Sequence, residues 1–275
     1  MVRRVISIAI YALCAAIGLL AFLYPFLLPS TPKAPTAMAH SQDAPLTTAA
    51  LVGLSVTALL VELQGQAISA KTVAMLGVLV AITSVLRFIE VVVPLPGGVS
   101  LVFAPILLCG YVFGARFGFL MGAFTLLASG LVTGGVGPWL PYQMFAAGWM
   151  GLSAGWLGGI ALVRGKSSHR VRGLGRRELT LLSVFGFGWG LLFGAIMNVY
   201  FWPFATGPAN QAWSAGASLG EALARYGAFY LATSLGWDVA RAVGNVALIL
   251  LLGAPTVRAL ARFRLRFHFE VHPRA

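Results

Sequence analysis

The chain has 275 residues, of which 59% are hydrophobic and only 9% are charged. Soluble domains carry about 25% charged residues, so this chain has too few polar side chains to cover itself in water. Its net charge of +12 does not indicate nucleic-acid binding, because the basic residues fall in short clusters between apolar runs. Membrane proteins show that pattern in their cytoplasmic loops, so the composition predicts an integral membrane protein.

Apolar runs of suitable length predict about eight membrane-spanning helices. A helix needs about 20 apolar residues to cross the bilayer, and the fourth run, of about 15 residues, is short by that measure. The predicted fold class is therefore an all-α integral membrane protein. The predicted spans are 5–28, 46–63, 72–93, 99–113, 117–134, 139–163, 180–202 and 226–252.

The distribution of Lys and Arg predicts the orientation. With the N-terminus inside, 15 of the 19 basic residues fall in inner segments and only Lys33 and Arg225 in outer ones. Such an excess marks the cytoplasmic side, so both termini are expected in the cytoplasm. The expected location is the plasma membrane of a prokaryotic cell, which the chain crosses several times. The alternative for the start of the chain is a cleaved signal peptide, with Arg3-Arg4 before the apolar run and a possible cleavage site at 37–39.

The spans divide into an N-terminal transmembrane hairpin, residues 1–66, and a six-helix core with a basic cytoplasmic tail, residues 67–275. Several core spans carry small residues at helical spacing, which lets membrane helices approach closely. We interpret these residues as seams within the chain. They are Gly114, Gly118 and Gly122 in the fifth span, and Gly148, Gly151, Gly155 and Gly158 in the sixth.

Four ionisable residues stand out inside predicted spans, where a charge costs several kcal/mol. Arg87 and Glu90 are three apart in the third span, and Asp238 and Arg241 are three apart in the last. That spacing places each pair on one helix face. The predicted spans put Arg87 and Glu90 near the outer surface, which favours a binding role. They put Asp238 and Arg241 near or below the bilayer middle, which favours a structural ion pair.

The third span also shows two different faces. At 100° per residue, the small residues cluster on one side, and the polar residues lie roughly 130° away. The small-residue face suits close docking of another helix, from this chain or a partner. The small residues are Ala74, Gly77, Ala81 and Ser84, and the polar ones are Thr83, Arg87 and Glu90.

Aromatic and amide side chains gather at the predicted outer ends of the spans. They form either an interfacial aromatic belt or a recognition cavity with rings for stacking. The residues are Trp139, Tyr142 and Gln143 at the start of the sixth span, Asn198, Tyr200 and Trp202 at the end of the seventh, and Trp213 in the loop 203–225.

No catalytic motif is present, so no enzyme activity is expected. Cys14 and Cys109 lie in apolar runs with no metal-binding spacing. The segment 165–167 imitates the end of a phosphate loop, but Ile160 stands where that motif requires glycine. The chain therefore has no recognisable ATPase site, and no cofactor of its own is predicted.

The stretch 135–144, Gly-Val-Gly-Pro-Trp-Leu-Pro-Tyr-Gln-Met, resembles the substrate-binding S components of energy-coupling factor (ECF) vitamin transporters. The resemblance covers roughly 72–266 and includes the stretch 234–238 and the basic segment 258–266. It implies a six-helix protein that binds a vitamin or related micronutrient from outside. It also implies docking on a transmembrane coupling subunit, which two cytoplasmic ATPases drive with ATP.

The resemblance places an AxxxA-type docking motif on the first core helix, at Gly77 and Ala81 here, and the hairpin 1–66 is extra to the family's six helices. The expected docking residues are Ala74, Gly77 and Ala81. The expected lids of the ligand site are 94–98, 134–138 and 203–225. The expected substrate-binding residues are Arg87, Glu90, Trp139, Gln143, Asn198, Tyr200, Trp202 and Tyr230.

Two other classes of function stay open at this point. One is a membrane enzyme or assembly factor that acts on a lipid-linked substrate, and the other is a self-sufficient secondary transporter. The vitamin is also open among cobalamin-like, biotin-like and other ligands, although the outer tryptophans favour a large or aromatic one.

Overall fold

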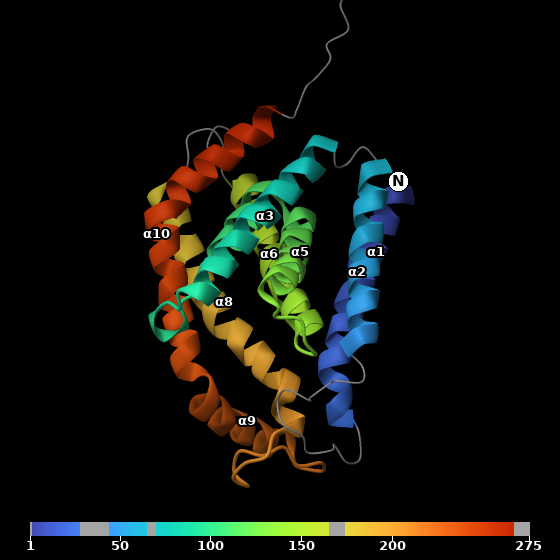
Figure 1. The fold of residues 1–275 in the computed structure, drawn as a ribbon, viewed down its shortest axis with the longest axis vertical. Coiled ribbons are helices and arrows are strands. Elements are labelled where there is room, and N and C mark those ends of the chain that lie inside the picture. The colour runs from blue at the N-terminus through green and yellow to red at the C-terminus, as the bar shows by residue number, and fades with distance from the viewer. Residues whose placement is uncertain (1, 28–43, 65–69, 165–173, 267–275) are drawn as a thin grey trace, which may run out of the picture.

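The computed structural model describes residues 2–27, 44–64, 70–164 and 174–266, and every regular element in these ranges is helical. Figure 1 shows the helices as a bundle with α3 crossing its face obliquely. The α-helices are α1 (Val2–Leu23), α2 (Ala44–Gln64), α3 (Ala70–Val92), α4 (Phe103–Phe113), α5 (Ala115–Thr133), α6 (Leu140–Arg164), α8 (Arg176–Phe201), α9 (Leu219–Thr233) and α10 (Leu235–Arg266). Short 3-10 turns are η1 (Tyr24–Leu27), η3 (Pro96–Gly98) and η4 (Trp202–Phe204).

The helices have the length and composition of membrane spans, which confirms the predicted all-α integral membrane fold. Among the described residues, five helical segments are long and apolar enough to cross a bilayer. The helix α4 has 11 residues and covers only about 16 Å at 1.5 Å per residue, in line with the shortness predicted for the fourth span. The five segments are Ala9–Leu27, Lys71–Val92, Ala115–Thr133, Arg176–Phe204 and Leu235–Phe263.

The first two helices form a hairpin that packs on the core. α1 contacts α2, and both contact α6. The Phe22 ring lies edge-on to Tyr142 of α6, with ring centroids 4.9 Å apart, and Gly18 leaves room for the ring of Phe145. Aromatic contacts therefore hold the N-terminal hairpin against the sixth span.

Glycines close the seam between α5 and α6, as the small-residue spacing predicts. A Cβ at Gly118 would lie 2.1 Å from the carbonyl oxygen of Gly151, and one at Gly122 would lie 2.1 Å from that of Ala147. Such close backbone approach replaces the hydrophobic effect as the source of packing in a membrane. Gly114 differs, since it lies in open space with φ of 99° and ends α4.

A second glycine seam, which the sequence reading missed, joins α8 to α10. A Cβ at Gly190 would lie 2.4 Å from the Cα atom of Ala242, and one at Gly194 would meet the carboxylate of Asp238. Asn245 donates from Nδ2 to the carbonyl oxygen of Gly186 at 3.0 Å. The spacing of four among Gly186, Gly190 and Gly194 was the signal available in the sequence.

The predicted last span, 226–252, is wrong at both ends. The helix is interrupted at Ser234, which has φ of −132° and ψ of −32° and separates α9 from α10. The spanning segment then runs from Leu235 to Phe263. Asp238 and Arg241 therefore occupy the first two turns of α10, rather than its middle, and the predicted depth of this pair is corrected accordingly. Tyr230 belongs to α9.

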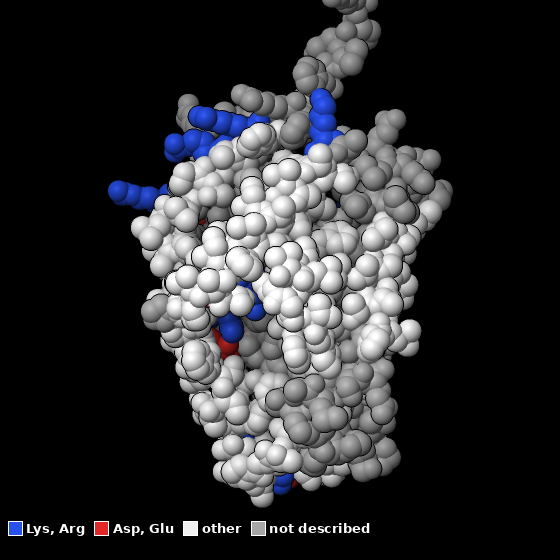
Figure 2. Space-filling view, in the orientation of Figure 1, with Lys and Arg blue, Asp and Glu red and all other residues white. Residues whose placement is uncertain are grey.

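The start of α1 and the end of α10 lie at the same end of the molecule (Figure 1). Basic side chains gather at that end in Figure 2, as the topology requires. Which side of the membrane this end faces stays a prediction from the charge distribution. The predicted cleavage region at 37–39, most of the basic loop 164–178 and the tail beyond residue 266 lie outside the described residues.

Candidate ligand-binding site

An ion pair near the C-terminal end of α3 organises the site. Arg87 Nη1 donates to Glu90 Oε1 at 2.8 Å, and the two side chains are 33% and 14% exposed. The second carboxylate oxygen of Glu90 accepts hydrogen bonds from Ser100 Oγ at 3.1 Å and from the backbone nitrogen of Leu101 at 3.2 Å. Glu90 thus orients Arg87 and ties the loop before α4 to the end of α3.

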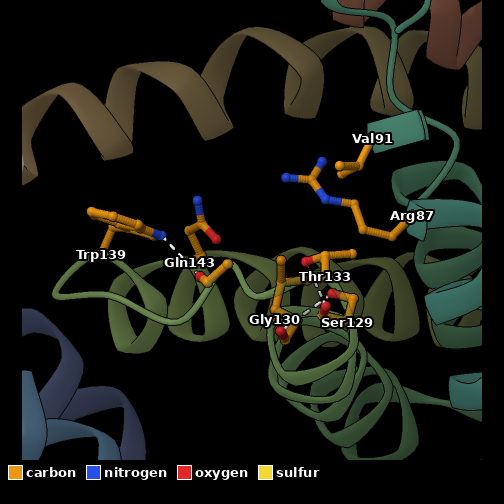
Figure 3. Close-up of a pocket in the computed structure, with 9 residues that line it drawn as sticks. Arg87, Val91, Ser129, Gly130, Thr133, Trp139 and Gln143 are labelled. Carbon is orange, nitrogen blue, oxygen red and sulfur yellow. Dashed lines mark hydrogen bonds between the residues drawn. The ribbon is translucent and has the colours of Figure 1, made fainter. Parts of the chain in front are cut away.

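Beside Arg87 lies a cavity of about 170 Å³ between α3, α5, the turn after α5 and the start of α6. Figure 3 shows the Arg87 side chain reaching toward Gln143 across this space, with Trp139 on the far side. In Figure 2, positive and negative side chains are visible in a hollow on the face that α3 crosses in Figure 1. The lining residues are Arg87, Val91, Leu126, Ser129, Gly130, Thr133, Gly135, Trp139 and Gln143.

Local hydrogen bonds fix the walls of the cavity. Thr133 Oγ1 donates to the carbonyl oxygen of Ser129 at 2.7 Å, and Trp139 Nε1 donates to that of Gly135 at 3.2 Å. Gly134 ends α5 with φ of 68°, a left-handed conformation that glycine adopts without strain. The chain can therefore turn directly from α5 into α6 and place Trp139 beside the cavity.

Three of the eight predicted binding residues line the cavity, namely Arg87, Trp139 and Gln143. Glu90 supports them through Arg87. The sequence reading missed Ser129 and Thr133, whose spacing of four puts both on one face of α5. Their position directly before the predicted lid 134–138 was the signal that could have identified them.

Asn198 and Tyr200 do not line this cavity but form contacts within the bundle. Asn198 is buried and donates from Nδ2 to Thr233 Oγ1 at 3.2 Å, which links α8 to α9. Tyr200 is buried against Tyr142, with ring centroids 4.7 Å apart. Both residues are therefore placed to stabilise the fold around the site.

Trp202 and Tyr230 also lie outside the cavity lining and make contacts near α9. Trp202 Nε1 donates to the carbonyl oxygen of Gln211 at 2.8 Å, which links the predicted lid 203–225 to the end of α8. Tyr230 donates from its hydroxyl to the carbonyl oxygen of Leu191 at 3.5 Å. Trp202 belongs to an aromatic cluster that packs around the end of α8. This outer aromatic cluster consists of Phe26, Trp202, Trp213, Tyr226 and Phe229.

The ion pair between Asp238 and Arg241 is present at the start of α10. Asp238 is 1% exposed, and it also accepts from Ser234 Oγ at 2.5 Å. The guanidinium carbon of Arg241 lies 5.7 and 5.6 Å from the ring centroids of Phe103 and Phe193. Both charges are thus enclosed by partners from α4 and α8.

The small-residue face of α3 points away from the bundle. Ala74, Gly77 and Ala81 are exposed, and a Cβ added at Gly77 would meet nothing within 4 Å. Ser84, which the helical arc grouped with them, is instead buried at 5% exposure, and Thr83 is buried at 1%. The open face therefore ends one turn earlier than predicted.

Comparison with known proteins gives one match. A family model for the substrate-specific component of ECF transporters matches residues 71–253, which include every residue that lines the cavity and the exposed face of α3. No curated protein and no solved structure matches the chain. The match covers well over half of the sequence, and the chain belongs to the family of substrate-specific components of ECF transporters.

Proposed function

We propose that this chain captures a vitamin or related micronutrient in the cavity beside Arg87 and delivers it to a coupling subunit driven by separate ATPases. The cavity carries the proposal. It lies at the C-terminal ends of α3 and α5, and it combines a cation, an amide, hydroxyl groups and an indole ring. Concave sites of this kind, with a few polar groups among apolar ones, are typical of small-molecule binding.

The exposed face of α3 supports the second half of the proposal. Ala74, Gly77 and Ala81 leave a smooth surface on which another membrane helix can pack closely. The glycine seams between α5 and α6 and between α8 and α10 are already filled by the chain itself. The α3 face is thus a small-residue surface that is available to a coupling subunit.

Reconstitution tests the proposed function. The tagged full chain is expressed with a coupling subunit and two ATPases, purified as a complex and placed in liposomes with each member of a labelled vitamin panel. We expect one vitamin to bind the isolated chain and to accumulate only when ATP is supplied. The control complex carries ATPases that cannot hydrolyse ATP.

Two results would count against the proposal. A chain that neither binds a vitamin nor associates with the coupling subunit does not serve capture. Accumulation by the isolated chain in an ion gradient, without ATPases, would favour a secondary transporter instead.

A further inference from the structure

We propose that the captured ligand is a small organic monocarboxylate, whose carboxylate is held by Arg87 and Gln143 and whose flat or apolar body packs on Trp139. This inference rests on the proposed capture function and names the chemical class of the micronutrient. It follows from the hydrogen-bonding capacity, the charge and the size of the cavity.

Arg87 has donors to spare. Arginine carries five N–H donors, and within the described chain the hydrogen-bond partner of the Arg87 side chain is Glu90, through Nη1. Figure 3 shows the rest of the guanidinium group extending into the cavity toward Gln143. Among the described residues, the Gln143 side chain has no hydrogen-bond partner. The two groups can therefore act together on one acceptor.

The charge favours a single carboxylate over a phosphate. Arg87 supplies the one formal charge among the lining residues, and Glu90 beside it already balances that charge. A dianionic phosphate would add repulsion from Glu90 that a monoanion limits. The planar guanidinium fork also matches a carboxylate in two parallel hydrogen bonds.

The size of the cavity favours a small ligand. Its volume of about 170 Å³ lies below the roughly 300–1,000 Å³ of sites for drug-sized ligands. A corrin ring does not fit such a space, so the cavity does not support the large ligand favoured by the number of outer tryptophans. The ring of Trp139 provides one apolar surface, suitable for a small ring or alkyl body.

Two buried hydroxyl groups lie one helical turn away from residues that line the cavity. Ser84 and Thr125 are 5% and 0% exposed, and their oxygens have no hydrogen-bond partner among the described residues. Ser84 lies three residues before Arg87 on α3 and Thr125 four before Ser129 on α5, so each lies one turn below a cavity residue on the same helix face. A buried hydroxyl group without a hydrogen-bond partner is destabilising. A polar group that extends beyond the cavity lining would satisfy them.

Matched ligand pairs test the carboxylate directly. The purified full chain in nanodiscs is titrated with nicotinate and nicotinamide, pantothenate and pantothenol, and biotin and biotin methyl ester. Thiamine, riboflavin and pyridoxal phosphate complete the panel. We expect one carboxylate to bind and its neutral counterpart to bind at least tenfold more weakly.

Variants place the effect at the cavity. The double variant Arg87→Gln with Glu90→Gln removes the cation without leaving an unpaired carboxylate, and it should abolish the preference for the carboxylate. Gln143→Leu should weaken binding severalfold. Arg258→Gln, which changes an exposed arginine near the end of α10 and outside the cavity lining, is the control and should bind normally.

The outcomes separate this inference from the proposed function. Binding of thiamine, riboflavin or pyridoxal phosphate, with no carboxylate bound, overturns the inference and leaves capture intact. Equal affinity for a carboxylate and its neutral counterpart overturns it as well. Absence of binding by every compound counts against both the carboxylate and the capture function.

Discussion

The helices α3 and α10 carry the same charge motif in two different settings. Each has an arginine and a carboxylate three residues apart. In α10 the carboxylate of Asp238 is 1% exposed and packs against Gly194 of α8. In α3 the carboxylate of Glu90 is 14% exposed, and its partner Arg87 is 33% exposed beside a cavity.

The small residues of the two regions differ in the same way. Gly190 of α8 touches the backbone of α10, whereas Gly77 of α3 faces open space. A spacing of three between charges or of four between glycines identifies a helix face, but it does not show what covers that face. We infer that the α8–α10 pair holds the bundle together, while α3 serves the ligand and the partner.

The largest expected effect comes from filling the α8–α10 seam. In Gly190→Leu, the new Cβ would lie 2.4 Å from the Cα atom of Ala242. The backbone of α10 cannot move aside as a flexible side chain can. We expect a loss of at least about 3 kcal/mol, the upper end for overpacked sites, and no monodisperse protein by size-exclusion chromatography. Gly188→Leu, two residues away in open space, should behave as wild type. A well-folded Gly190→Leu protein would show that this seam is not close-packed.

Removing the buried carboxylate of α10 should cost nearly as much. Asp238→Ala leaves Arg241 without its ion-pair partner, and breaking a buried pair costs about 3–5 kcal/mol. The melting temperature and yield of the detergent-purified protein should therefore fall sharply. An unchanged melting temperature would mean that the pair does not hold α10 in place.

Trp139 and Trp202 should respond differently to replacement by alanine. Trp139→Ala removes the ring beside the cavity and should weaken ligand binding at least tenfold, or about 1.4 kcal/mol. Trp202→Ala opens the outer aromatic cluster and should lower the melting temperature more than the affinity. Isothermal titration and melting curves of both variants separate the two effects. Equal affinity losses in both would return Trp202 to the binding site.

The smallest expected effect is at Glu90. Glu90→Gln weakens the interaction that orients Arg87, so the Arg87 side chain loses more conformational freedom when the ligand binds. The variant also removes the repulsion between Glu90 and an anionic ligand, which acts in the opposite direction. We expect a net loss of about threefold in affinity, or 0.7 kcal/mol, and a smaller fall in melting temperature than for Asp238→Ala. A Glu90→Gln protein that melts early yet binds normally would assign Glu90 to the scaffold.

The sequence alone predicts the helical membrane fold and part of the site. Arg87 and Gln143 stand out because charged and amide groups are costly in hydrocarbon, and Trp139 stands out among the aromatic residues at the predicted ends of the spans. Glycine spacing likewise predicts the α5–α6 seam. These inferences succeed because each depends on one helix and its polarity.

The remainder depends on how helices meet. The break at Ser234 interrupts a continuous apolar run without a proline, so hydropathy alone merges α9 with α10. Trp202 and Tyr200 share a helix end with Asn198, yet they pack on different neighbours. Ser129 and Thr133 are ordinary residues until α3 brings Arg87 beside them.

Docking through α3 is tested most directly by two matched tryptophan variants. Gly77→Trp and Gly188→Trp each place an indole where the structure has open space, one on α3 and the other on α8. Both proteins should fold and bind ligand as wild type does. Copurification with the coupling subunit should be lost in Gly77→Trp and retained in Gly188→Trp. Retention of the coupling subunit by a folded Gly77→Trp protein would contradict docking through α3.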